Sequence, residues 1–177
     1  MAIVQVNFLL SLLVIIGQLF SLALIIHLIF RRNKRCKLVG LIINRAIPLA
    51  FIVALIATSG SLYYSEIAQF VPCKLCWFQR IFIYPQTIIL GIAWLKKDRQ
   101  ILDYSLALIF LGGLISLYHN YIYYTAKPSL ICSVVAPCTE KYVTGFGYIT
   151  IPLMALTALV LMGLLLFIKK VDYLDIK

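Results

Sequence analysis

Four of the five cysteines form two closely spaced pairs, and such pairs can exchange disulfide bonds. Cys73 and Cys76 form a C-x-x-C motif that follows Pro72, and Cys132 and Cys138 are separated by five residues. A thiolate attacks one sulfur of a disulfide, a mixed disulfide forms, and the electron pair passes to the bridge that opens. Two pairs that face each other would therefore relay electrons taken from the thiols of a soluble partner.

Two other uses of the four paired cysteines remain open from the residues alone. Together they offer the four ligands of a structural zinc site, although a bundle packed in lipid has little need of such a staple. Two inert disulfides are the second alternative, but closing the short C-x-x-C loop constrains few residues and stabilises a fold little. We expect redox exchange and no metal site, with Cys36 as a reduced spectator.

The residues around the C-x-x-C motif predict how it is activated and where its electrons go. A thiolate at a helix amino terminus feels the positive end of the helix dipole, which lowers the thiol pKa. Gln79 and Arg80 lie one turn further, and Arg80 projects beside Cys76 at i+4. Thiol exchange needs a final electron acceptor, and a membrane offers quinones. A fixed cation beside Cys76 would stabilise a thiolate and the charge on a reduced quinone. The alternative is an interfacial arginine that only extends its charge to the lipid headgroups. His119 is either a proton donor to quinone or a packing residue.

Hydropathy predicts the elements that must position these residues. The chain has 177 residues, 63% of them apolar and 12% charged, with a mean hydropathy of +1.02, which excludes a soluble domain. A membrane-spanning helix needs roughly 20 mostly apolar residues. Five stretches qualify, and lipid requires them to be helical: Ile3 to Phe30, Ala46 to Tyr64, Trp77 to Leu95, Ile101 to Tyr124, and Tyr148 to Ile168.

The basic residues predict the orientation of these helices. Five spans place twelve of the 16 lysines and arginines on one side, in the loops after the first and third spans and after the fifth. The other side receives four: Lys74, Arg80, Lys127 and Lys141. The positive-inside rule then puts the amino terminus outside and the carboxyl terminus in the cytoplasm. Both cysteine pairs face the oxidising side, Cys36 faces the cytoplasm, and the net charge of +10 reflects topology and not nucleic-acid binding.

The first apolar stretch is expected to be retained in the membrane. It lacks a basic region before its apolar core, its apolar run is long, and the basic segment 31–37 stops translocation. We therefore predict an all-α integral membrane protein, a four-helix transmembrane bundle with one additional amino-terminal transmembrane helix. Residues 1–37 form the accessory helix and its basic loop, and residues 38–177 form the redox bundle.

The stretch from Pro72 to Arg80, PCKLCWFQR, resembles the signature of the disulfide-bond formation protein B (DsbB) family. It joins P-C-x-L-C to an arginine four residues later, and the second cysteine pair falls in the next external loop. The likeness covers roughly Arg45 to Ile168, four of the five helices. Because only five residues separate Cys132 from Cys138, the chain is similar to the compact BdbC-like form of Gram-positive relatives, and its first helix is additional.

The resemblance implies a role for each cysteine. Cys132 and Cys138 would form the bridge that faces a thioredoxin-like, DsbA-type oxidase, and Cys132 would make the mixed disulfide with it. Cys73 and Cys76 would form the bridge regenerated by a membrane quinone, menaquinone or ubiquinone. The implied quinone site combines Cys76, nearest the ring, with Gln79, Arg80 and His119. The reaction would sustain disulfide formation in proteins exported across a bacterial plasma membrane.

Two competing functions stay open at this point. A quinone reductase of the vitamin K epoxide reductase type is similar in its helices and cysteines, although the sequence Gln79-Arg80 after the C-x-x-C favours the DsbB family. A non-enzymatic channel subunit or assembly protein with structural disulfides is the second. Redox titration separates it from an enzyme, because static bridges are harder to reduce than catalytic ones.

Overall fold

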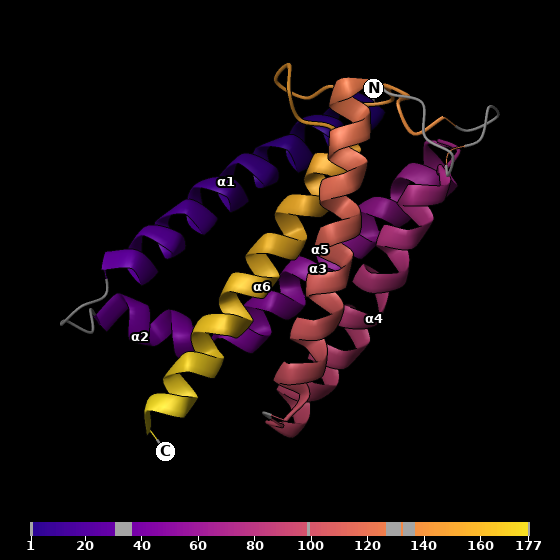
Figure 1. The fold of residues 1–177 in the computed structure, drawn as a ribbon. Coiled ribbons are helices and arrows are strands. Elements are labelled where there is room, and N and C mark those ends of the chain that lie inside the picture. Colours follow the sequence, from indigo (N-terminus) through magenta and orange to yellow (C-terminus); the bar gives the residue numbers. More distant parts are fainter. Residues whose placement is uncertain (1, 31–36, 99, 127–131, 133–136, 177) are drawn as a thin grey trace.

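The computed structural model describes residues 2–30, 37–98, 100–126, 132 and 137–176. Every long element among them is a helix (Figure 1). In chain order these are α1 (Ala2–Phe30), α2 (Lys37–Asn44), α3 (Ala46–Leu62) with its π-helical extension η1 (Tyr63–Ile67), α4 (Lys74–Lys96), α5 (Ile101–Thr125) and α6 (Ile151–Ile176).

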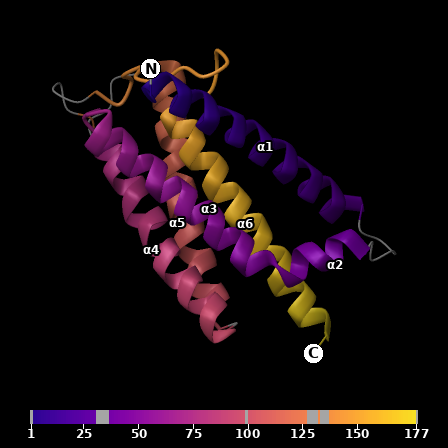
Figure 2. The same ribbon diagram turned by 180° about the vertical axis from the view of Figure 1, so that it is seen from behind.

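Four of these helices form a closed bundle. α3 packs against α4 and α6, and α5 packs against the same two helices, so that the order around the bundle is α3, α4, α5, α6 (Figures 1 and 2). Its core contains fully buried side chains such as Leu90, Met162, Leu165 and Leu166. A short connection joins α4 to α5, whereas a longer segment between Thr125 and Ile151 joins α5 to α6. The side chains that face lipid remain apolar because the bilayer is their solvent.

α1 lies outside this bundle and packs against α6, and α2 leads from its end toward the start of α3 (Figure 2). In the described part of the chain five helices are long and apolar enough to cross a membrane: α1, α3 with η1, α4, α5 and α6. The predicted all-α membrane bundle with one additional amino-terminal helix is therefore confirmed.

Several helix boundaries differ from those predicted, most of them by one or two residues. α4 begins at Lys74 rather than Trp77 because Cys73 caps it. α6 begins at Ile151 rather than Tyr148, since a turn occupies residues 145–149 and Gly147 adopts a φ of 83° there. α6 also continues past the predicted end at Ile168. The short helix α2 was not predicted, because its eight residues cannot span a membrane and follow a basic segment.

The basic residues that the structure describes gather mostly at one end of the bundle. Arg45 precedes α3, Lys96 and Lys97 end α4, and Lys170 lies near the end of α6, where its Nζ is 2.6 Å from Asp103 Oδ1. The cysteines of both pairs lie at the opposite end. Cys36 and the basic segment 31–35, on which the predicted orientation also depends, fall outside the described residues.

Candidate redox site

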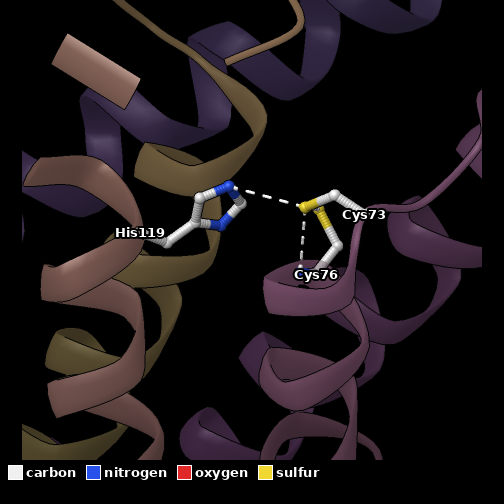
Figure 3. A group of neighbouring side chains, drawn as sticks. All are labelled: Cys73, Cys76 and His119. Atoms are coloured by element: carbon white, nitrogen blue, oxygen red, sulfur yellow. Dashed lines mark hydrogen bonds between the residues drawn. The ribbon is translucent and has the colours of Figure 1, made fainter. Parts of the chain in front are cut away.

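The amino terminus of α4 holds the C-x-x-C motif. Cys73 is the N-cap residue, with φ −71° and ψ 169°, and its sulfur accepts a hydrogen bond from the Cys76 backbone N–H at 3.3 Å. Both residues are free thiols whose sulfurs lie 3.1 Å apart (Figure 3). Cys73 is buried and Cys76 is half-buried. The exposed N–H groups and positive dipole end of α4 therefore act on Cys73 most directly.

His119 of α5 faces these two thiols (Figure 3). Its Nε2 lies 3.7 Å from Cys73 Sγ and 3.3 Å from the carbonyl oxygen of Cys138. Its Nδ1 lies 3.4 Å from Gln79 Oε1. The ring is fully buried, so its polar atoms depend on these three neighbours. His119 thus connects the two cysteine pairs.

A buried chain of hydrogen bonds fixes the orientation of His119. The Ser116 hydroxyl donates to the carbonyl oxygen of Pro152 at 3.4 Å, and the Gln79 amide nitrogen donates to Ser116 Oγ at 2.9 Å. This leaves Gln79 Oε1 as the acceptor that faces His119 Nδ1, which must then carry its proton. The other ring nitrogen, Nε2, lies near both the Cys138 carbonyl oxygen and Cys73 Sγ, where it can exchange a proton with the sulfur.

These contacts lower the pKa of the Cys73 thiol to about 4. The largest cause is the hydrogen bond with Cys76, and the hydrogen bond and charge of His119 act in the same direction. Burial raises the pKa but does not outweigh these contacts. Cys73 in the reduced pair is consequently a thiolate at neutral pH.

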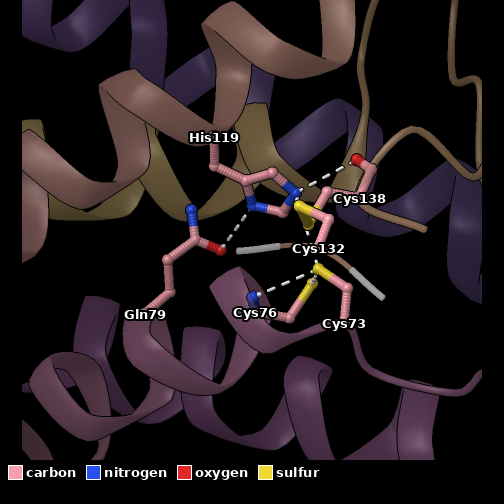
Figure 4. The surroundings of a disulfide bond; sticks show 6 residues. All are labelled: Cys73, Cys76, Gln79, His119, Cys132 and Cys138. Atoms are coloured by element: carbon pink, nitrogen blue, oxygen red, sulfur yellow. Dashed lines mark hydrogen bonds between the residues drawn. A yellow bond between two sulfur atoms is a disulfide. The ribbon is translucent and has the colours of Figure 1, made fainter. Parts of the chain in front are cut away.

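Cys132 and Cys138 are joined by a disulfide bond, the pairing that the resemblance implies. Cys138 is 4% exposed and packs with Cys73 in one buried cluster, and the half-buried Cys132 packs against it (Figure 4). This bond removes two of the four ligands that a four-cysteine zinc site would need. The ligand atoms of Cys73, Cys76 and His119 lie within 4.8 Å of one another and offer two thiolates and one imidazole when the cysteines are reduced.

Arg80 lies one turn after Cys76, but its hydrogen bonds connect α4 to α3. Its Nε donates to Ser61 Oγ at 3.0 Å and its Nη2 to the Ser61 carbonyl oxygen at 3.2 Å. Tyr84 also donates to Ser61 Oγ, at 3.1 Å, and the guanidinium carbon lies 5.2 Å from the centre of the Trp77 ring. These contacts hold the cation in place beside the C-x-x-C motif, where snorkelling alone would leave it mobile.

A cavity of about 330 Å³ opens beside the motif. The residues that line it at this end include Cys73, Cys76, Gln79, Arg80 and His119. Tyr64 and Tyr123 line it too, and among the described residues their buried hydroxyls have no hydrogen-bond partner. The volume is that of a small-molecule site, and the hydroxyls are donors available to a ligand's oxygens.

The structure brings all seven predicted site residues together at one end of the bundle, around His119 and this cavity. The sequence did not single out Ser61, Ser116, Tyr64 or Tyr123. A polar side chain within an apolar span is the signal that would have found the serines, because such groups need partners inside the bundle. The tyrosines gave no comparable signal among the 11 tyrosines of the chain.

Comparison with known proteins decides the family. The model of the family "Disulfide bond formation protein DsbB" matches residues 44–169. The chain belongs to the DsbB family. It is 49% identical over 116 residues to "Probable disulfide formation protein C 1" of Bacillus anthracis, covering 64% of this chain and 83% of that protein. It is 42% identical over 127 residues to "Disulfide bond formation protein C" of Bacillus subtilis, covering 68% and 89%.

The family makes this chain a multi-pass membrane protein and a disulfide-forming oxidoreductase. The match extends beyond Bacillus, since "Probable disulfide formation protein" of Coxiella burnetii (strain CbuK_Q154) is 40% identical over 70% of this chain and 86% of its own length. No solved structure matches. The match supports the DsbB family over the vitamin K epoxide reductase type. All of α1, and α2 except its last residue Asn44, lie outside the residues that the family model matches.

The low pKa of Cys73 leads to a first prediction. In the reduced protein, alkylation of Cys73 by iodoacetamide should keep a constant rate across the neutral range and slow only as the pH falls toward about 4, because the thiolate is lost below its pKa. His119→Leu should move this midpoint to higher pH. His27→Leu, which changes the other histidine of the chain, is the control. Mass spectrometry of the Cys73 peptide measures the rate, and an unmoved midpoint in His119→Leu would show that His119 does not act on this thiol.

Proposed function

We propose that this protein reoxidises an extracytoplasmic thioredoxin-like dithiol oxidase of the DsbA type and transfers the electrons to a membrane quinone. The observation that carries the proposal is the position of Cys73 and Cys76. They line a cavity that also contains Arg80, and on their other side Cys73 packs against the disulfide of Cys132 and Cys138. One thiol pair thus lies between a bridge near the surface and a site for a small molecule.

The first step takes electrons from the partner. A thiolate of the partner attacks Cys132 Sγ, the Cys132–Cys138 bond breaks, and Cys138 leaves as a thiolate. The partner's second thiolate then attacks the mixed disulfide, so the partner is released with its own disulfide and Cys132 is left reduced. Half-buried Cys132 is the accessible sulfur of this bridge, since Cys138 is 4% exposed.

The second step passes the electron pair inward. The Cys138 thiolate attacks Cys73 in the oxidised Cys73–Cys76 bridge, and Cys76 leaves as a thiolate. Cys132 then attacks Cys138, re-forms the Cys132–Cys138 disulfide and releases Cys73. A leaving thiol of low pKa leaves faster, and the low pKa of Cys73 favours this release. This step leaves Cys73 and Cys76 reduced beside an intact disulfide of Cys132 and Cys138.

The cavity suits a quinone. A bound quinone accepts two electrons and two protons as the Cys73–Cys76 disulfide re-forms. The chain's own contribution is to place Cys76 and the Arg80 cation at the cavity wall and to hold His119, with Nδ1 tied to Gln79, as a group that can exchange a proton at Nε2. Tyr64 and Tyr123 offer hydroxyl donors for the ring oxygens.

We further propose that both cysteine pairs face the outside of a bacterial plasma membrane. The basic residues support this orientation, because Lys96, Lys97 and Lys170 lie at the end of the bundle away from the cysteines. A membrane-impermeant maleimide applied to intact cells should therefore leave Cys36 unlabelled until the membrane is opened. Labelling of Cys36 from outside would place the redox pairs in a reducing compartment and contradict the proposal.

Arg80 provides the test of the quinone step. Arg80→Gln removes the cation but keeps a hydrogen-bonding side chain, and we expect the KM for quinone to rise about tenfold to a hundredfold, since a charge-assisted interaction contributes roughly 1.5–3 kcal/mol. Quinone reduction by the purified protein with a reduced thioredoxin-like oxidase measures it. Lys74→Gln, a charge removal at the exposed start of the same helix, is the control and should leave the KM unchanged. An unchanged KM in Arg80→Gln would show that Arg80 does not act on the quinone and contributes only to helix packing.

A further inference from the structure

The cavity beside the cysteines extends well beyond them. From Cys73 it follows α4 to Tyr84, and on α6 it is lined from Ile151 to Leu161. On α1 the lining runs from Leu10 to Phe20, which corresponds to about 15 Å along the helix axis. The space therefore reaches from the redox pair to roughly the middle of a hydrocarbon core about 30 Å thick.

α1 supplies one wall of this space, and that wall is entirely apolar. Its lining residues are Leu10, Leu13, Val14, Ile16, Gly17 and Phe20. Arg80 and His119 lie at the cysteine end and come from other helices. The polar side chains further along the lining, Tyr84 and Thr157, already donate hydrogen bonds to other groups of the protein. The site is thus divided into a polar end and an apolar passage, which matches a ligand with a polar head and a long apolar tail.

Specific contacts hold α1 in this position. The Gln18 amide donates to Thr157 Oγ1 at 3.4 Å, and the Tyr148 hydroxyl donates to Gln18 Oε1 at 3.0 Å. Gly17 lies so close to α6 that a Cβ at this residue would be 3.4 Å from Thr157. Polar contacts within the membrane and small residues at a crossing are the features of a specific helix interface. α1 is consequently a fixed wall and not a loosely tethered anchor.

We infer that α1 forms a wall of the passage for the apolar tail of the quinone. The inference rests on the proposed quinone-dependent function, and it assigns the accessory helix α1 a role in that function. α1 lies outside residues 44–169, which match the family model, so this wall is not part of the matched region. The bundle supplies the chemistry at the ring, and α1 contacts the tail, which makes binding depend on the length of that tail.

Two adjacent leucines of α1 provide a matched test. Leu13 lines the passage and Leu12 does not, although they are 37% and 40% exposed. In protein reconstituted into lipid nanodiscs, Leu13→Trp should raise the KM for a menaquinone with a long prenyl tail by about tenfold, equivalent to roughly 1.4 kcal/mol of lost tail binding. The KM for menadione, which has the same ring without a tail, should not change. Leu12→Trp should change neither.

The controls separate the inference from the function on which it rests. A parental protein that reduces neither quinone would overturn the proposed function itself. If the parental protein reduces both and the two variants behave alike, α1 is not a wall of the passage. If Leu13→Trp raises the KM for menadione as much as the KM for the long-tailed quinone, the substitution acts on ring binding or on the fold, and the inference is also overturned. Unchanged menadione turnover in the same preparation shows that the variant is folded.

Photocrosslinking identifies the molecule that occupies the passage. A photoreactive group at the end of a long-tailed quinone should crosslink to residues of α1 that line the passage, such as Leu13 and Val14, in preference to Leu12, and excess unlabelled long-tailed quinone should suppress the crosslink. A photoreactive phospholipid acyl chain that labels the same residues, unaffected by quinone, would show that lipid fills the space and would overturn the inference.

Discussion

The Cys76→Ser variant is expected to lose quinone reduction by on the order of a thousandfold or more, the scale seen when a covalent catalytic group is removed. Serine cannot form a disulfide with Cys73, so the pair can neither accept electrons from Cys138 nor deliver two electrons as a disulfide closes. The effect should fall on turnover and not on assembly, because Cys76 is half-buried at the first turn of α4 and contributes little to the core.

The measurement is the rate of quinone absorbance loss with a reduced thioredoxin-like oxidase as electron donor. Cys36→Ser is the matched control, because it makes the same substitution at the cysteine outside both pairs, and it should keep the parental rate. Equal yields of both variants in the membrane fraction show that insertion is intact. Quinone reduction at the parental rate by Cys76→Ser would remove the C-x-x-C motif from the electron path.

The fold was largely predictable from the sequence because lipid permits few alternatives. An apolar run long enough to span a bilayer must be helical, and each of the five predicted runs corresponds to a helix. What hydropathy could not specify was packing. Nothing in the run from Ile3 to Phe30 indicated that α1 contacts α6 and borders the cavity, since these contacts depend on how far each helix is rotated about its axis.

The candidate site shows how a small boundary error changes the chemistry. The helix after the C-x-x-C was predicted from Trp77, whereas α4 begins at Lys74. Because the helix begins three residues earlier, Cys73 is its N-cap residue, where the helix dipole and the Cys76 N–H act on the Cys73 sulfur. Sequence reasoning placed Arg80 beside Cys76, and both residues do line the cavity, but it did not predict that the hydrogen bonds of Arg80 reach Ser61 on α3. The spacing of residues along the chain does not predict contacts of this kind between helices.

His119 illustrates the same limit. From the sequence, His119 could be either a proton donor to quinone or a packing residue. The structure shows it buried between Cys73 and the carbonyl oxygen of Cys138, with Gln79 and Ser116 fixing its ring. It also lines the cavity. A single histidine thus lies between the two cysteine pairs and also borders the proposed quinone site.

The Cys138→Ala variant should stop turnover in a different way, by accumulating a covalent adduct with the partner. In this variant Cys132 has no disulfide and remains a thiol. Its thiolate attacks the disulfide of an oxidised thioredoxin-like partner, and the bond between the two proteins forms as the partner's bridge opens. The intramolecular attack by which Cys138 would release Cys132 is no longer available, so only the partner's own second thiolate can open the adduct, and alkylating that thiolate as it forms traps the adduct.

Accessibility decides which sulfur carries this adduct. Cys132 is half-buried, whereas Cys73 and Cys138 are 5% and 4% exposed and lie in one buried cluster. A soluble protein can approach Cys132 without disturbing that cluster, but it cannot reach Cys73 unless the loop that carries Cys138 moves away. We therefore expect the outer pair to meet the partner and the C-x-x-C pair to exchange electrons with Cys138 and the proposed quinone.

Non-reducing electrophoresis of Cys138→Ala mixed with the oxidised partner should show a band at the sum of the two masses, which reductant removes. The band should be absent in the Cys132→Ala/Cys138→Ala double variant, the matched control that retains Cys73 and Cys76. Mass spectrometry of the adduct should locate the bond at Cys132. A bond at Cys73 would reverse the order of the relay, because it would mean that the buried thiolate beside His119 meets the partner first and that Cys132 and Cys138 act after it.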